Sequence, residues 1–159
     1  MIAMNKNLKT TLIAWPLIAA LSIFTCFLTK VVAEYFGITL ESQESVAFVK
    51  KLAGWNLKFF YMLAMLLIVA PILEEFIFRY LLWKLPDSKN FWAGTIPSSI
   101  LFVAAHYIQM DWPNDAFAAL FVFAVAQCWL YNKTQSILSP ILSHALFNLT
   151  NTVLIFVVE

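Results

Sequence analysis

Charged residues are scarce in this sequence of 159 residues: Asp, Glu, Lys and Arg make up 12% of it, while 62% is hydrophobic. Soluble domains carry about 25% charged residues, and one small core could not hide this much apolar surface. Disorder is excluded as well, because disordered chains combine low hydrophobicity with high charge. Glycine is rare too, at three residues, which excludes collagen-like and flexible low-complexity chains. The composition therefore predicts an integral membrane protein, with residues 1–159 forming a single membrane domain.

The sequence also has little net charge and few cysteines. A net charge of +1 without a basic patch argues against a nucleic-acid partner. Cys26 and Cys128 lie far apart in apolar stretches, where they are interpreted as small buried residues rather than a disulfide framework. The expected partners are membrane lipid and a membrane-associated peptide or protein.

Five apolar stretches are long enough to cross a membrane. A helix of about 20 apolar residues spans the bilayer core, and the candidates are residues 10–29, 59–83, 91–110, 116–131 and 136–158. The predicted fold is all-α: a polytopic transmembrane helical bundle of about five spans, with a first span at 10–29 and a core at 59–158. In the connection 31–58, residues 44–55 predict an amphipathic helix in the membrane interface, between spans one and two.

The lysines predict an orientation, because loops on the cytoplasmic side of a membrane are enriched in Lys and Arg. A cytoplasmic N-terminus places five lysines on the cytoplasmic side: Lys6, Lys9, Lys84, Lys89 and Lys133. The opposite side then receives four lysines together with the acidic loop at 111–115. We therefore expect the N-terminus to be cytoplasmic.

The second apolar stretch contains three charged residues, Glu74, Glu75 and Arg79. A charge at the centre of a membrane helix costs about 2.5–3.5 kcal/mol, so these charges need compensation. Glu75 and Arg79 are four residues apart in the order that favours an ion pair on one helix face. Glu74 is turned by about 100° from Glu75 and lacks such a partner. It is the freer carboxylate and the candidate general base.

Both histidines of the chain also fall inside predicted spans. His106 lies in the third span and His144 in the fifth, where Asn148 follows four residues later on the same helix face. Glu74, His106, His144 and Asn148 could converge from three helices on one intramembrane cavity. The alternative is that such residues are only interhelical contacts. We interpret Gln127, Ser139, Thr150 and Asn151 in that second way.

Several hydrolase motifs are absent from the sequence. There is no His-Glu-x-x-His pattern of zinc proteases and no Gly-x-Ser-x-Gly pattern of serine hydrolases. The aspartates, Asp87, Asp111 and Asp115, all lie in loops, which excludes a membrane-embedded aspartyl dyad. What is left is a site in which Glu74 and His106 activate water.

The sequence resembles the CAAX protease and bacteriocin-processing family, also called the Abi or glutamic-type intramembrane endopeptidase family. That family carries Glu-Glu-x-x-x-Arg, Phe-x-x-x-His and His-x-x-x-Asn on core helices, and residues 74–79, 102–106 and 144–148 match these motifs in order. The resemblance implies an intramembrane protease. Its catalytic residues would be Glu74 and His106, which activate water, and His144 and Asn148, which stabilise the oxyanion. Glu75 and Arg79 would be supporting groups, and Phe102 would pack.

The resemblance leaves cofactor, substrate and role as expectations. We expect no cofactor; the alternative is zinc bound by Glu74, His106 and His144, since the same residue types bind that metal. The substrate would be a CAAX-type protein, a bacteriocin leader or a C-terminally anchored protein, and the location the inner membrane of a bacterium or archaeon. The alternative function is a non-catalytic immunity or scaffold protein that binds a membrane peptide. A proton-coupled transporter is a third hypothesis.

Overall fold

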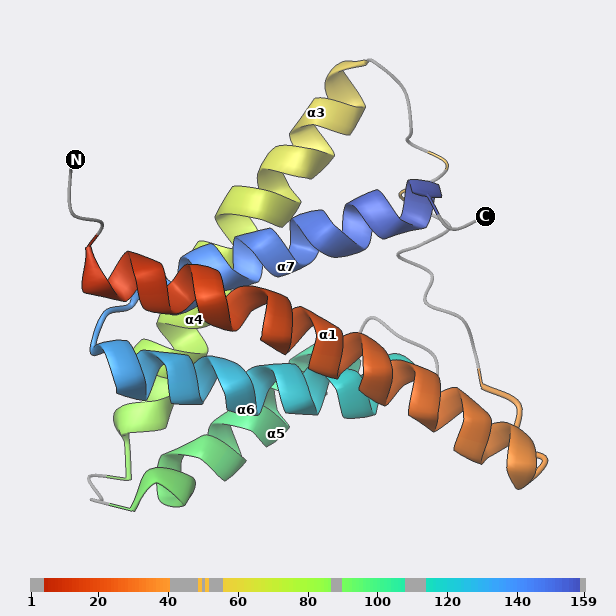
Figure 1. Ribbon diagram of the computed structural model, residues 1–159, viewed down its shortest axis with the longest axis horizontal. Coiled ribbons are helices and arrows are strands. Elements are labelled where there is room, and N and C mark those ends of the chain that lie inside the picture. The colour runs from red at the N-terminus through yellow and green to blue at the C-terminus, as the bar shows by residue number, and fades with distance from the viewer. Residues whose placement is uncertain are drawn as a thin grey trace.

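A computed structural model describes residues 5–40, 49, 51, 56–86, 90–107 and 114–157, and these residues fold mainly as helices (Figure 1). The elements are α1 (Lys6–Tyr35), α3 (Leu57–Ala64), η1 (Met65–Val69), α4 (Ala70–Glu75), η2 (Phe76–Leu81), η3 (Leu82–Lys84), α5 (Phe91–Tyr107), α6 (Ala116–Thr134) and α7 (Leu138–Val157). The segments from α3 to η3 form one continuous helix, Leu57–Lys84, in which η1 and η2 are π-helical. We call it the composite helix. The predicted all-α fold is confirmed.

Four of the described helices are long and apolar enough to cross a membrane: α1, the composite helix, α6 and α7. They correspond to the first, second, fourth and fifth predicted spans. The third predicted span, 91–110, forms α5 over 17 residues, and its last three residues lie outside the described part of the chain. Of the predicted interfacial helix at 44–55, the structure describes Val49 and Lys51, both helical, and the other residues lie outside it.

Helix α1 continues beyond Lys30, which was predicted to bound the first span. The Lys30 Nζ atom lies 2.8 Å from Asp115 Oδ2, directly before α6. Because the lysine has this partner, its charge does not have to end the helix. The helix ends at Tyr35 and is followed by Gly37, whose φ of 68° is a conformation that favours glycine.

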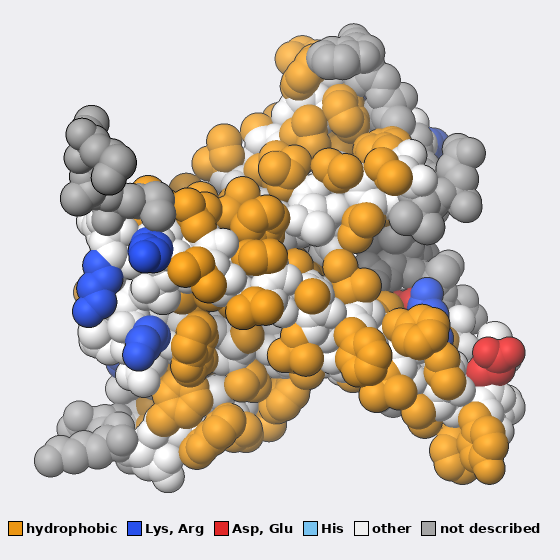
Figure 2. Space-filling model, viewed as in Figure 1, with side chains coloured by type: hydrophobic (Ala, Val, Ile, Leu, Met, Phe, Trp, Pro, Cys, Tyr) orange, Lys and Arg blue, Asp and Glu red, His pale blue; other side chains and the backbone are white. Residues whose placement is uncertain are grey.

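The two faces of α1 are arranged as expected for a helix between protein and lipid. Its buried face is mostly small or hydroxylated: Thr11, Ala14, Ile18, Ala19, Ser22 and Ala33. Large apolar side chains, among them Leu17, Phe24 and Phe27, are exposed. Figure 2 shows hydrophobic side chains covering the middle of this face of the molecule. Small residues let helix backbones approach closely where lipid removes any hydrophobic drive to associate.

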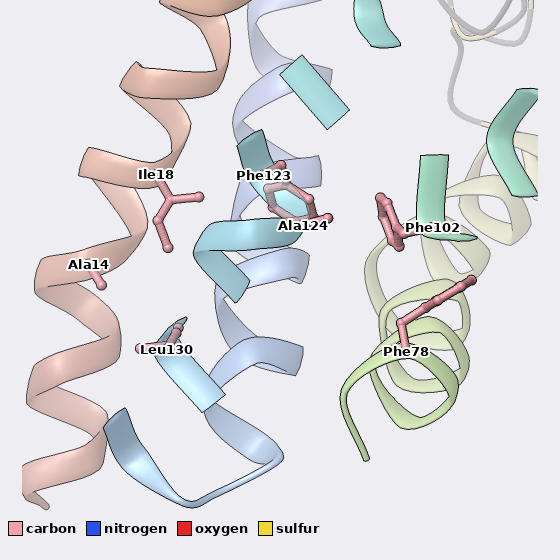
Figure 3. Close-up of a cluster of buried hydrophobic side chains, with 7 residues drawn as sticks. All are labelled: Ala14, Ile18, Phe78, Phe102, Phe123, Ala124 and Leu130. Carbon is pink, nitrogen blue, oxygen red and sulfur yellow. The ribbon is translucent and has the colours of Figure 1, made fainter. Parts of the chain in front are cut away.

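Helix α6 occupies the centre of the bundle and contacts α1, α5 and α7 (Figure 1). The buried core contains Phe123, Ala124 and Leu130 of α6 beside Ala14 and Ile18 of α1. Two aromatic side chains extend this core to the other helices (Figure 3): Phe78 from η2 and Phe102 from α5, with ring centroids 5.2 Å apart. Phe147 of α7 packs against this core, which thus joins the helices that carry the three sequence motifs.

A glycine sets the distance between α5 and the end of the composite helix. A Cβ atom on Gly94 would overlap the backbone carbonyl of Trp83. The indole of Trp83 in turn donates a hydrogen bond to Thr95 Oγ at 2.9 Å. This close approach fixes α5, which carries His106, against the helix that carries Glu74.

Basic residues gather at the end of the molecule where α1 begins. Asn7 Nδ2 donates to the Thr134 carbonyl at 3.1 Å, which joins the start of α1 to the end of α6. Figure 2 shows Lys and Arg side chains at this end. Lys6, Lys9 and Lys133 lie near this joint, in agreement with their predicted placement on one side of the membrane. That this side is cytoplasmic stays a prediction.

Candidate active site

Both glutamates of the first motif lie on α4, a six-residue segment between two π-helical segments. Pro71 is in the first turn of α4, and because the composite helix runs on through this point, the N–H that proline lacks is missing from the interior of a helix. π-Helical insertions change which side chains face a neighbour, and they are frequent at functional sites. Here they determine how Glu74 and Glu75 are turned toward α5 and α7.

Glu75 is fully buried and held by two cationic or polar partners. Its Oε2 atom lies 3.0 Å from Arg79 Nε, so the predicted ion pair forms. Its Oε1 atom lies 2.7 Å from His144 Nδ1 on α7. This second contact was not predicted. Both carboxylate oxygens are occupied, so Glu75 is a structural centre between the composite helix and α7.

The buried Arg79 guanidinium is compensated from three sides. Besides Glu75, its Nη2 donates to the Ala124 carbonyl of α6 at 3.4 Å. Its central carbon lies 4.6 Å from the centroid of the Phe102 ring, a cation–π contact. A buried charge is tolerated only with such partners. Phe102 thus packs, as the resemblance implied, and also faces the guanidinium.

Glu74 lies in quite different surroundings. Its side chain is 26% exposed and that of His106 24% exposed. Glu74 Oε2 lies 3.9 Å from His106 Nε2 and 3.8 Å from His144 Nε2. Both distances exceed a hydrogen bond, and within the described residues this oxygen has no hydrogen-bond partner. The structure therefore brings Glu74, His106 and His144 together around a carboxylate oxygen that is not committed elsewhere.

The hydrogen bonds of the two imidazoles determine which nitrogen faces Glu74. His106 Nδ1 lies 2.8 Å from the Phe102 carbonyl, which can only accept, so this nitrogen carries the proton. His144 Nδ1 donates in the same way to Glu75. Both rings consequently point Nε2 at Glu74. In its neutral form His106 offers a lone pair there, which can accept a proton from water.

Asn148 contacts the backbone of the composite helix rather than the Glu74 oxygen. It follows His144 by one turn of α7, but its Nδ2 donates to the backbone carbonyl of Leu66 in η1 at 2.9 Å. Within the described residues, this hydrogen bond is the polar contact that the Asn148 side chain makes. The structure thus brings three of the four predicted catalytic residues together and assigns Asn148 a partner on the backbone of the composite helix.

The prediction that Gln127 forms an interhelical contact is confirmed: its Nε2 donates to Ser143 Oγ on α7 at 3.2 Å, directly before His144. Other contributors were missed by sequence reasoning. The ring of Phe123 lies 4.9 Å from that of His144, edge to face. Ser98 donates to the Phe78 carbonyl at 2.5 Å. Backbone carbonyls and isolated serines carry no signal in a single sequence, so only the spacing of Gln127 and Ser143 on facing helices could have indicated a contact.

The described residues contain no group of three or more His, Cys, Asp or Glu side chains placed to bind a metal ion. In the predicted zinc set, Glu74 Oε2 lies 3.9 Å from His106 Nε2 and 3.8 Å from His144 Nε2. Sensitivity to a chelator distinguishes a metal-dependent reaction from a metal-free one.

Comparison with protein families gives a match to this chain. The family model described as "Type II CAAX prenyl endopeptidase Rce1-like" matches residues 56–150. These residues include the composite helix, α5, α6 and the part of α7 with His144 and Asn148. Comparison with curated proteins and with solved structures gave no match.

Proposed function

The chain belongs to the Rce1-like family of type II CAAX prenyl endopeptidases, and from this premise we propose that it hydrolyses a peptide bond inside the membrane without a metal. The observation that carries the proposal is the uncommitted Glu74 oxygen, which faces His106 Nε2 and His144 Nε2 across 3.9 and 3.8 Å. These polar groups come from three helices of an otherwise apolar membrane protein. A carboxylate kept only for packing would be paired, as Glu75 is.

Water is the nucleophile of the proposed reaction. A water molecule in contact with Glu74 Oε2 and His106 Nε2 gives up a proton to the Glu74 carboxylate as its oxygen attacks the carbonyl carbon of the substrate. The proton passes to the leaving nitrogen when the carbon–nitrogen bond breaks. The products are a free carboxylate and a free amine. The side chains of Glu74 and His106 are partly exposed, while the Glu74 Oε2 atom between the two imidazoles is itself buried.

The oxyanion of the tetrahedral intermediate is stabilised from α7. His144 donates from Nε2 when its ring carries both protons, while Glu75 accepts the charge-assisted hydrogen bond from Nδ1. Asn148 has two amide hydrogens, of which one serves the Leu66 carbonyl, so the second can contribute. Glu75 and Arg79 support this arrangement by fixing His144.

The substrate class follows from the family and from the membrane. We propose a membrane-associated protein or peptide: a CAAX-type protein, a bacteriocin leader or a C-terminally anchored protein. We further propose that the protein lies in the inner membrane of a bacterium or archaeon with its N-terminus in the cytoplasm. The four apolar helices make it an integral membrane protein.

The test is cleavage of a fluorogenic membrane-peptide library by purified protein in detergent. Replacing Glu74 by Gln should slow cleavage by about 10²–10⁴-fold, the usual contribution of a general base. Glu34→Gln is the matched control, because it makes the same change on an exposed carboxylate of α1 and should leave the rate unchanged. An active Glu74→Gln variant, or peptide binding without cleavage by the wild type, would overturn the proposal in favour of a non-catalytic binding protein.

A strong chelator added to the wild type decides between water activation by Glu74 and His106 alone and the zinc alternative. Under the proposal the cleavage rate is unchanged. Loss of cleavage that zinc restores would instead make Glu74, His106 and His144 metal ligands.

A further inference from the structure

We propose that Asn148 is a positioning residue: its side-chain amide takes the place of a backbone N–H that Pro71 lacks, and it thereby fixes the register of the helix that carries Glu74 and Glu75. Its effect on cleavage rests on the proposed function, whereas its effect on the helix does not. The starting point is the hydrogen-bond pattern of η1. There the Ala70 N–H donates to the Met65 carbonyl, five residues back.

The next carbonyl in this pattern loses its donor. Five residues beyond Leu66 is Pro71, whose ring nitrogen has no hydrogen. The residue four beyond it, Ala70, already donates to Met65. An unpaired carbonyl inside a membrane protein is costly, because no water is available to pair with it. Asn148 Nδ2 meets the Leu66 carbonyl at 2.9 Å, a normal hydrogen bond.

The second π-helical segment is also contacted by a side chain from another helix. In η2 the buried Ser98 hydroxyl, from α5, donates to the Phe78 carbonyl, which accepts a backbone hydrogen bond from the Leu82 N–H as well. Each π-helical segment that flanks α4 is therefore contacted at a carbonyl by a side chain from a different helix: α7 on one side and α5 on the other. Side chains of α7 and α5 therefore stabilise the two π-helical stretches of backbone.

The register matters because the two glutamates have opposite surroundings. Successive helix residues are turned by about 100°, and a change of one residue in register would move Glu75 out of contact with Arg79 and His144. Glu75 would then no longer be the buried, paired carboxylate, and Glu74 would no longer be the carboxylate that faces His106. Asn148 and His144 lie one turn apart, so α7 holds the composite helix at two points, the Leu66 carbonyl and the Glu75 carboxylate.

The proposal is tested by a double-mutant cycle of Asn148→Ala and Pro71→Ala. Pro71→Ala supplies the missing N–H and alone should change kcat/KM less than tenfold, since Asn148 still serves the carbonyl. Asn148→Ala should lower kcat/KM by about 10²-fold, the scale expected for a small misplacement of reacting groups. The double variant should recover at least tenfold. An equal loss from Asn148→Ala in both backgrounds would show that Asn148 acts on cleavage only as an oxyanion donor, and this would overturn the proposal.

A second readout does not depend on peptidase activity. The chain has two histidines, both in the site, so ¹⁵N-histidine labelling gives an NMR spectrum that reports on this site alone. Asn148→Ala should shift the His144 ring resonances, and Pro71→Ala added to it should restore them. Asn151→Ala, the same change one turn further along α7, is the control and should leave the spectrum as in the wild type. Unshifted resonances in Asn148→Ala contradict the proposal whether or not any peptide is cleaved.

Protein yield settles the case in which a variant does not fold. If Asn148→Ala fails to accumulate as folded protein, the double variant should accumulate, because the Leu66 carbonyl is paired again. Failure of the double variant as well would contradict the exchange between amide and N–H. If the wild type cleaves nothing but the spectra behave as expected, the proposed function fails and the positioning role stands.

Discussion

The two halves of the site differ although they begin at adjacent residues. In the closed half, Glu75 is fully buried and both of its carboxylate oxygens are bound, by Arg79 and by His144 Nδ1. In the open half, Glu74 is partly exposed and its Oε2 faces the Nε2 atoms of His106 and His144 beyond hydrogen-bond distance. The contrast separates two tasks: the ion pair and the hydrogen bond on Glu75 give rigidity, and a carboxylate oxygen without a partner is available to a reacting molecule.

Arg79→Met should have the largest effect on stability, because it leaves the Glu75 carboxylate buried without its cation. Breaking a buried pair on one side costs about 3–5 kcal/mol, measured here as the free energy of unfolding in detergent. Glu74→Gln, in the open half, should change the same quantity by less than about 0.5 kcal/mol, as substitutions away from packed features do. The contrast is sharpened if the double variant Glu75→Gln/Arg79→Met regains most of the lost stability. It is broken if Arg79→Met is as stable as the wild type.

Gln127→Met should have an intermediate effect, because it removes the support behind His144 but keeps the side-chain volume. Losing the hydrogen bond to Ser143 should cost about 1 kcal/mol of unfolding free energy. A double-mutant cycle with Ser143→Ala measures the energy of this hydrogen bond directly, since Ser143→Ala should cost less unfolding free energy when Gln127→Met is already present. Additive effects would mean that the bond at 3.2 Å contributes nothing to the closed half.

Lys30→Met should have the smallest effect. The lysine side chain is 60% exposed and that of Asp115 6% exposed, and an ion pair with one well-solvated partner should contribute no more than about 1 kcal/mol. Because its partner Asp115 lies far from Glu74 along the chain, before α6, we expect cleavage to be unchanged. In an Asp115→Asn background, Lys30→Met should no longer change the free energy of unfolding. A loss of activity in Lys30→Met would show that the end of α1 is coupled to the open half.

Local spacing predicted some of these features and tertiary packing decided the others. The Glu75–Arg79 pair could be predicted because four residues of one helix separate the partners. The contact between Glu75 and His144 could not, since it depends on how α7 approaches the composite helix. His106, His144 and Glu74 are polar residues inside apolar stretches, and this pattern predicted that they converge. They do lie together.

The helix boundaries and the backbone partners were the parts that a sequence pattern could not supply. Hydropathy predicted a membrane span at 10–29, and the helix that contains it continues to Tyr35, past the ion pair of Lys30 with Asp115. Asn148 was predicted on the face of His144, and it is the backbone of Leu66 that it meets. π-Helical segments depend on single displaced hydrogen bonds, and apart from Pro71 nothing in the composition of residues 65–81 indicates them.

The arrangement of α1 has a consequence for how its sequence can vary. Its outward residues contact a medium that distinguishes little between Leu, Ile, Phe and Val, so exchange among these types should be nearly neutral. Its inward residues, such as Ala14 and Ser22, meet neighbouring helices at close range, and a single added methylene group there would push the helices apart. Related sequences should therefore drift freely on one side of this helix and stay small on the other.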